Sequence, residues 1–273
     1  MDSLNIDIGV IIINNICTLK CKKCITLTPY QKRPINFDVA DIKNDIDGFF
    51  EIFEKCNHFD IEGGETLLHP DITEIVSHSL KYSDRFKYTA ILTNGTIVPK
   101  KELLEFCKDK PVFFIIDDYG EKLSIKKSEV IESLKEYNLN YRIDTYHSDN
   151  QYCGGWIDMG DFSYKNYSKE QLMSNFKRCR ATQGIPYIKE GKIFSCTIAA
   201  PGISHIPLLP GEYIDLRDKN QTISEKIETA KNFYKKPIAH CAFCNAFIIS
   251  SPRIAAAEQF KTGELTDDMK ICD

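Results

Sequence analysis

The sequence has no long apolar run, no stripe of basic residues, no internal repeat and no low-complexity tail. Its longest apolar stretch near the N-terminus, Ile8–Ile13, is too short for a membrane span or for the core of a signal peptide. A formal net charge of −4 and the lack of clustered lysine and arginine argue against a nucleic-acid backbone as the main partner. We therefore expect a cytoplasmic protein that binds neither a membrane nor a nucleic acid.

Enough apolar residues are present to build a sizeable core. The chain has 273 residues, of which 42% are hydrophobic, which excludes wholesale disorder and favours one large domain or a medium domain with an appendage. Eleven residues are cysteines. Because disulfides are rare in a reducing cytosol, their number and spacing predict metal binding.

The first half of the chain alternates between predicted strands and predicted helices. Strands are expected at Ile8–Ile13, His58–Glu62, Lys87–Thr93, Val112–Ile116 and Asn140–Thr145, and helices at Phe37–Cys56, Asp71–Tyr82, Pro99–Lys108 and Ser128–Tyr137. Parallel strands with right-handed crossovers follow, in an open sheet or in a full or partial barrel. In such folds the chemistry lies at the carboxyl ends of the strands.

After about residue 150 the pattern changes. A glycine- and aromatic-rich stretch with a strand near Trp156–Met159 leads to predicted helices at Lys169–Lys177 and Ser224–Tyr234, with a β-hairpin at Ile185–Ile188 and Lys192–Cys196 between them. We place a boundary near residue 165, which predicts two domains, residues 1–165 and 166–273.

Three cysteines follow the first predicted strand. Cys17, Cys21 and Cys24 have C-x3-C-x2-C spacing. Thiolates are soft ligands that suit iron and zinc, and three on one short loop can hold three corners of a cubane cluster while the fourth iron stays open. The alternative is a zinc site that lacks one ligand, whereas structural zinc sites usually close all four positions.

From these cysteines onward the chain resembles the radical S-adenosylmethionine (radical SAM) superfamily, over roughly residues 7–145. The cysteine loop follows the first strand, Gly63-Gly64-Glu65-Thr66 the second, Asn94-Gly95 the third, and Asp117 and Asp118 the fourth. The family often has an aromatic residue before the third cysteine, where this chain has Lys23. The resemblance implies an α/β fold, a partial (β/α)6 parallel barrel with a small C-terminal α+β domain.

The same resemblance implies a role for each motif. The methionine part of SAM binds the open iron through its amine and carboxylate. Gly63 and Gly64 have no side chains, so their backbone approaches that amine closely, and Glu65 suits a cationic ammonium. Asn94 and Asp117 contact the SAM ribose or the substrate, unless they only cap helices or form turns.

A second set of cysteines lies in the C-terminal part. It consists of Cys179, Cys196, Cys241 and Cys244. Four thiolates close either a zinc site or a second iron–sulfur cluster, and chemistry alone does not separate the two. Their order resembles the twitch domain, a truncated relative of the SPASM domain, which implies an auxiliary cluster. The cofactors implied are therefore two 4Fe-4S clusters and SAM.

Four cysteines remain. Cys56 and Cys107 are interpreted as buried packing residues and Cys272 as part of a tail. Cys153 follows the fifth strand beside Gly154-Gly155, where its thiol could donate a hydrogen atom to a substrate radical, although simple packing is the other interpretation.

The reaction also follows from the resemblance. A reduced cluster, supplied by flavodoxin or ferredoxin, cleaves SAM to methionine and a 5′-deoxyadenosyl radical, which removes hydrogen from the substrate. The chain length and the twitch spacing resemble the aminocyclitol dehydrogenase of butirosin biosynthesis, which oxidises a secondary alcohol to a ketone. We therefore expect an oxidoreductase acting on a carbohydrate-like small molecule. The catalytic candidates are Cys153, Asp158 and Arg142, and by position alone also Asp161, Tyr146 and His147.

Three alternatives stay open. A radical epimerase would use Cys153 as hydrogen donor. A peptide maturase often carries an additional N-terminal recognition domain, for which a strand beginning near residue 7 leaves no room. A purely structural iron–sulfur protein would produce no 5′-deoxyadenosine from SAM.

Overall fold

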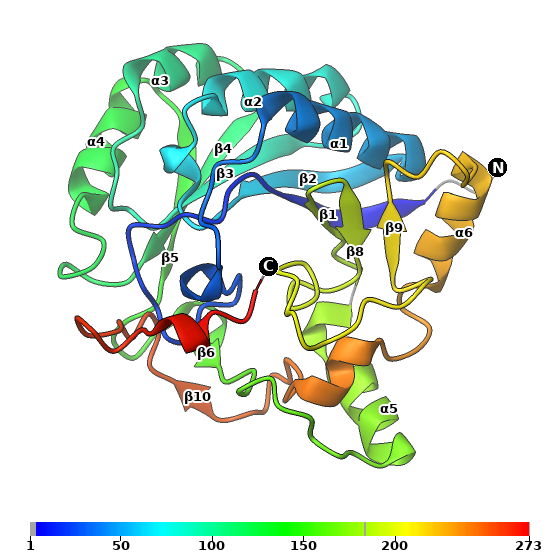
Figure 1. The fold of residues 1–273 in the computed structure, drawn as a ribbon. Helices are drawn as coiled ribbons and strands as arrows, with labels where there is room; N and C mark the ends of the chain where they lie inside the picture. The colour runs from blue at the N-terminus through cyan, green and yellow to red at the C-terminus, as the bar shows by residue number, and fades with distance from the viewer. Residues whose placement is uncertain (1–3, 183, 273) are drawn as a thin grey trace.

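The computed structural model describes residues 4–182 and 184–272. Its N-terminal half alternates strands and helices as predicted (Figure 1). The strands are β1 (Asn5–Ile12), β2 (Lys55–Glu62), β3 (Tyr88–Thr93), β4 (Val112–Asp118) and β5 (Asn140–Thr145), and the helices are α1 (Val39–Ile52), α2 (Ile72–Ser79), α3 (Lys101–Cys107) and α4 (Lys127–Glu136).

The C-terminal half is built from shorter elements. They are β6 (Trp156–Ile157), α5 (Lys169–Arg178), β7 (Tyr187–Lys189), β8 (Lys192–Phe194), β9 (Tyr213–Asp215), α6 (Ile223–Asn232) and β10 (Arg253–Ile254). Within the described ranges, no helix is long and apolar enough to cross a bilayer.

One sheet of eight strands runs through both halves of the chain. Its order is β5-β4-β3-β2-β1-β7-β8-β9. Strands β1 to β5 pair in parallel, β7 pairs in parallel with β1, and β8 and β9 continue antiparallel. The mostly parallel α/β fold of partial-barrel type is therefore confirmed. The proposed boundary near residue 165 stays a prediction, because the C-terminal hairpin extends the same sheet.

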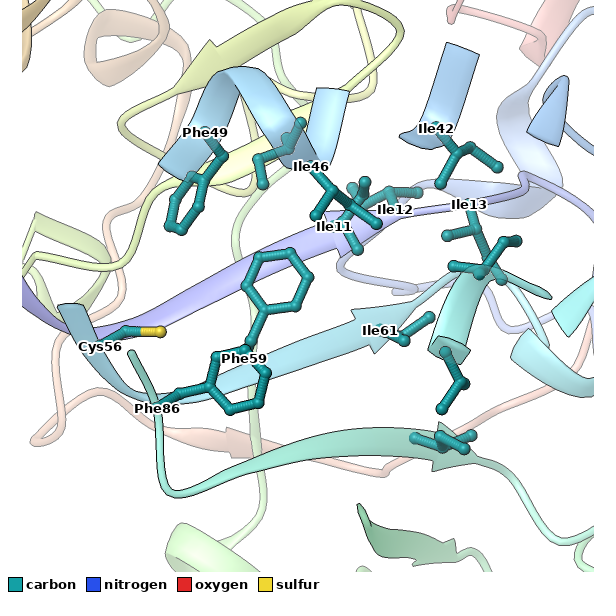
Figure 2. Close-up of a cluster of buried hydrophobic side chains, with 14 of the residues drawn as sticks. Ile11, Ile12, Ile13, Ile42, Ile46, Phe49, Cys56, Phe59, Ile61 and Phe86 are labelled. Atoms are coloured by element: carbon teal, nitrogen blue, oxygen red, sulfur yellow. The ribbon is translucent and has the colours of Figure 1, made fainter. Parts of the chain in front are cut away.

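Helices α1 to α4 cover the outer face of the parallel strands (Figure 1). The core between them is aliphatic and aromatic. Figure 2 shows Ile11 of β1 and Phe59 of β2 near Ile46 and Phe49 of α1, all of them fully buried. Gly9 permits this packing, because a Cβ there would lie 2.5 Å from the Phe49 ring. Apolar burial on this face leaves the opposite face of the sheet free for polar side chains.

Element boundaries differ from the sequence prediction where tertiary pairing decides them. Helix α1 ends at Ile52, so Cys56 belongs to β2 rather than to a helix end. Strand β9 was not predicted, because three residues are too few for a periodic pattern. The predicted hairpin is present, and both residues of its turn, Glu190 and Gly191, have positive φ (47° and 78°), as a type I′ turn requires.

Candidate active site

A cavity of about 480 Å³ opens at the carboxyl ends of the parallel strands. This volume lies in the range of small-molecule sites. The sequence-predicted residues that the structure brings to its wall are Cys17, Cys21, Cys24, Gly63, Gly64, Asn94, Asp117, Arg142 and Cys153. Glu65 and Asp158 lie outside that wall.

Two of the three cysteines of the first loop accept side-chain hydrogen bonds at their sulfur atoms. Asn94 Nδ2 donates to Cys17 Sγ at 3.4 Å, and Gln259 Nε2 donates to Cys21 Sγ at 3.1 Å. Burial and the nearby Cys24 and Cys17 thiols raise the pKa of Cys21 to about 12. Crowded thiols of this kind lose their protons when a cation binds them, so the donor set fits an iron–sulfur cluster.

Residues 258–260, near the C-terminus, form hydrogen bonds with the backbone of this loop. Lys22 N donates to Glu258 O at 2.8 Å, and Phe260 N donates to Lys20 O at 2.9 Å. The Gln259 side chain accepts from Lys20 N at 2.7 Å while it donates to Cys21. The pairing spans more than two hundred residues of sequence, so spacing gives no sign of it. Gln259 therefore belongs to the cluster loop in space.

The glycine pair after β2 packs directly against the backbone that leads to Cys17. A Cβ on Gly64 would lie 2.2 Å from Ile16 O, and a Cβ on Gly63 would lie 2.3 Å from Asn14 Oδ1. Gly64 N donates to Asn14 Oδ1 at 2.9 Å. The glycines are thus required sterically, in addition to any approach to a ligand.

Substitution of Gly64 by alanine is expected to reduce the iron bound by the first loop about tenfold or more. The added Cβ must displace the Ile16 carbonyl, and overpacking of this kind costs about 1–3 kcal/mol. Iron content and cluster absorbance after anaerobic reconstitution measure the effect. The matched control is Gly48→Ala in α1, where the Cβ meets only the end of the flexible Leu216 side chain. Equal iron in both variants would contradict this prediction.

Glu65 connects the ends of β2 and β3 from beneath the cavity. Only 1% of its surface is exposed. Its carboxylate accepts from Leu67 N at 3.0 Å and from Asn94 N at 2.8 Å, and burial raises its pKa to about 7. Asn94 Oδ1 in turn accepts from Thr96 N at 3.0 Å. Asn94 therefore forms the turn after β3 and also faces the cavity.

Polar side chains on the inner face of β2 were missed by sequence reasoning. His58, Asp60 and Glu62 are two residues apart, so they share the face that lines the cavity. Phe59 and Ile61 alternate with them and belong to the core under α1. The signal was this alternation of polar and apolar residues within the predicted strand His58–Glu62.

The carboxyl groups of this wall hold protons more tightly than usual. Burial, and then the charges of Asp60 and Asp117, raise the pKa of Glu62 to about 8. Burial, and then the charges of Asp144 and Glu65, raise the pKa of Asp117 to about 7. Acids tuned to neutral pH in a cavity are suited to proton transfer.

Arg142 stands beside these acids on β5. Its guanidinium donates to both carboxylate oxygens of Asp144, with distances of 3.1 to 3.2 Å. Asp144 is buried, so the paired cation offsets its desolvation. Arg142 therefore both orients Asp144 and presents its own edge to the cavity.

The remaining catalytic candidates divide between the cavity and the surface. Cys153 is exposed at the cavity wall, with φ of 50°, and Arg180 Nη1 lies 3.7 Å from its sulfur. Tyr146 also lines the wall. Asp158 instead pairs with Lys23 Nζ at 2.9 Å. The two other positional candidates face elsewhere: His147 bonds to Asp118 and Asp161 to Lys165.

The second set of cysteines surrounds a separate, small cavity. Cys179, Cys196, Cys241 and Cys244 all line it. Burial, and then the charges of the other three thiols, raise the pKa of Cys196 well above its usual range. Within residues 4–182 and 184–272, no three His, Cys, Asp or Glu side chains, those of the first loop included, are arranged to hold a single metal ion. Four thiols around one cavity, two of them buried and two half-buried, fit a sulfur-ligated cluster.

The two cavities share a thin wall. Met159 lines both of them. Cys196 faces the small cavity while the next residue, Thr197, faces the large one, and Cys179 and Arg180 divide in the same way. Groups bound in the two cavities would therefore be neighbours.

Comparison with known families agrees with this geometry. The profile of the Radical SAM superfamily matches residues 11–182, which is more than half of the chain. A curated relative, the antilisterial bacteriocin subtilosin biosynthesis protein AlbA of Bacillus subtilis (strain 168), is 32% identical over 120 residues. That match covers 44% of this chain and only 24% of AlbA.

Solved structures share the fold across most of the chain. BtrN in complex with AdoMet and 2-DOIA is 16% identical, has a TM-score of 0.59, and is matched over 94% of this chain and 100% of its own. The anSMEcpe enzyme with bound AdoMet is 14% identical, has a TM-score of 0.53, and is matched over 84% of this chain and 83% of its own. At these identities the likeness concerns the fold alone.

Proposed function

This chain belongs to the radical SAM superfamily, and from that premise we propose that it oxidises a secondary alcohol of a carbohydrate-like small molecule to a ketone. When bound, a 4Fe-4S cluster and SAM supply the 5′-deoxyadenosyl radical that takes the hydrogen atom. Cys17, Cys21 and Cys24 hold that cluster, and Gly63 and Gly64 give SAM close access to the backbone. Flavodoxin or ferredoxin in the cytoplasm would provide the electron.

Alcohol oxidation removes a hydrogen atom from carbon, a proton from the hydroxyl group and one further electron. The carboxylate of Glu62 is placed to accept the proton, because it lies on the cavity wall with a pKa near 8. Cys179, Cys196, Cys241 and Cys244, which line the neighbouring cavity, would hold an auxiliary cluster able to accept this electron. The observation that carries the proposal is that Met159 lines both cavities, while the consecutive residues Cys196 and Thr197 line one cavity each.

The lining of the large cavity supports a polyhydroxylated substrate. Tyr119, Tyr146, Tyr152 and Trp156 form an aromatic cluster at one side, with ring centroids 5.4 to 6.4 Å apart. Sugar and cyclitol rings present apolar C–H faces to such rings, while their hydroxyl and amino groups donate to carboxylates. The four acids, Asp60, Glu62, Asp117 and Asp144, favour neutral or cationic rings over phosphorylated ones. BtrN, which has the same fold, was solved with 2-DOIA.

An anaerobic screen tests this function. Amino sugars, cyclitols and nucleotide sugars are each incubated with reconstituted enzyme, SAM and reductant, and 5′-deoxyadenosine and a product with two hydrogens fewer are measured together. We expect an amino sugar or cyclitol to give both in equal amounts. Formation of 5′-deoxyadenosine without any such product from the whole set would contradict the proposal.

The likeness to AlbA favours a second candidate, maturation of a peptide. AlbA is named for the biosynthesis of a bacteriocin, and 120 residues of this chain are 32% identical to it. In that case the hydrogen atom would be removed from a peptide carbon, and the product would be protein-bound or peptidic. The same screen, with a peptide arm added, separates the two candidates.

Substitution of Cys153 by serine separates oxidation from epimerisation. Under the oxidation proposal, we expect product formation within about twofold of wild type, because Cys153 lies at the cavity wall without a role in the electron balance. An epimerase that quenches a substrate radical with this thiol would lose turnover while still cleaving SAM. Loss of product with intact 5′-deoxyadenosine formation would therefore overturn oxidation in favour of epimerisation.

A further inference from the structure

Two buried polar groups at the small cavity lack hydrogen-bond partners. In the part of the chain that the structure describes, the two ring nitrogens of His240 make no hydrogen bond, and the hydroxyl group of Tyr234 makes none either. Both residues line the cavity formed by the four cysteines, and only 2% of the surface of His240 is exposed. They come from different elements, since Tyr234 follows α6 and His240 lies in the turn Ala239–Phe243.

Unpaired groups of this kind are costly. A buried donor or acceptor without a partner costs about 1–3 kcal/mol, and native structures contain few of them. Each residue brings a donor to the cavity wall: an imidazole carries at least one N–H in either protonation state, and a phenol carries one O–H.

The surroundings of these donors are sulfur-rich and otherwise mostly apolar. Cys196 lines the same cavity as Tyr234, and Cys241 directly follows His240 in the chain. Apart from Asn175 and Ser195, the rest of the wall is apolar or sulfur-bearing. Besides the oxygens of Asn175 and Ser195, the side-chain acceptors that the other wall residues offer to these two donors are sulfur atoms.

We propose that Tyr234 and His240 donate hydrogen bonds to the sulfur atoms of the auxiliary cluster and thereby raise its reduction potential. This inference rests on the auxiliary cluster of the proposed function. One-electron reduction adds a negative charge to the cluster, and fixed donors stabilise the more negative state more strongly, especially where the surroundings are apolar. A higher potential makes the cluster a better acceptor for the electron that the substrate loses. The two residues are thus positioning residues for electron transfer.

A redox titration tests the inference on full-length chains that also carry alanine at Cys17, Cys21 and Cys24, so that only the auxiliary cluster contributes. Tyr234→Phe and His240→Leu are each expected to lower the ratio of reduced to oxidised cluster at a fixed potential about tenfold, which is about 59 mV for one electron. The matched control is Tyr213→Phe, because Tyr213 of β9 stacks on Phe194 and does not line the cavity. His240→Gln retains a donor and should recover much of the loss.

Iron analysis separates failure of the inference from failure of the proposed function. The background chain should hold about four iron atoms. Absence of iron, or one zinc in its place, would overturn the auxiliary cluster and the inference together. The inference alone would be overturned if the chains held four irons and the ratio of reduced to oxidised cluster in both Tyr234→Phe and His240→Leu lay within twofold of the ratio in the Tyr213→Phe control. If Tyr234→Phe does not retain iron, the comparison of His240→Leu with His240→Gln decides. If His240→Leu does not retain iron, the comparison of Tyr234→Phe with Tyr213→Phe decides.

Discussion

Replacing Cys241 by alanine is expected to lower formation of the oxidised product by at least a hundredfold while SAM is still cleaved. Cys241 is one of the four thiols around the small cavity, and its loss would deprive the proposed auxiliary cluster of one of its four ligands. The first loop and its cysteines belong to the other cavity and keep their contacts. Product and 5′-deoxyadenosine measured in the same reaction report the two effects separately.

Cys21→Ala is the counterpart of this variant, because it should abolish both products. Cys107→Ala serves as the control: Cys107 is fully buried in the core of the barrel and touches neither cavity. Wild-type amounts of oxidised product from the Cys241 variant would show that the four cysteines do not hold the electron acceptor. SAM cleavage by the Cys21 variant would show that the first loop does not hold the catalytic cluster.

Substitution of Glu62 by glutamine is expected to lower product formation by about 10²–10⁴-fold, the usual contribution of a general base. Wild-type turnover should rise with pH through about pH 7 to 8, because the carboxyl must lose its proton before it can accept one. Asp60 on the same strand, Asp117 on β4 and Tyr187 on β7 act on Glu62 electrostatically, so the profile reports the group as a whole. In Glu62→Gln, the rise of turnover with pH should disappear.

Stability provides a second readout of Glu62. Its pKa in the folded chain lies above the ordinary glutamate value, so the folded state loses stability as pH rises from about 4.5 to 8. Glu62→Gln should therefore raise the melting temperature at pH 8 and change it little at pH 4. The control is Glu54→Gln, since Glu54 is exposed and does not line the cavity. An unchanged pH–rate profile in Glu62→Gln would assign the base elsewhere.

Local patterns made it predictable that the three cysteines of the first loop lie together at one cavity. Cys17, Cys21 and Cys24 lie within eight residues, and the strand before them is a clear apolar run. The same holds for Gly63-Gly64, although the sequence did not reveal that Gly64 contacts the Ile16 carbonyl. Motifs that form within one loop carry their spacing in the sequence.

Features that depend on the sheet could not be predicted in this way. Glu62 on β2 and Asp144 on β5 line a common cavity although β3 and β4 separate their strands in the sheet. Gln259 reaches Cys21 only through the fold of the C-terminal segment. Glu65 was assigned to the SAM site because of its motif. The structure buries its side chain outside the cavity wall, where its carboxylate connects the ends of β2 and β3.

Deuterium transfer tests the central claim most directly. An amino sugar or cyclitol that supports turnover is labelled with deuterium at each alcohol carbon in turn, and the 5′-deoxyadenosine formed by the wild-type enzyme is examined by mass spectrometry. We predict deuterium from one alcohol carbon only, with a ketone at that same carbon and one ketone for each 5′-deoxyadenosine. Label transfer from no sugar or cyclitol, together with transfer from a peptide, would contradict the account.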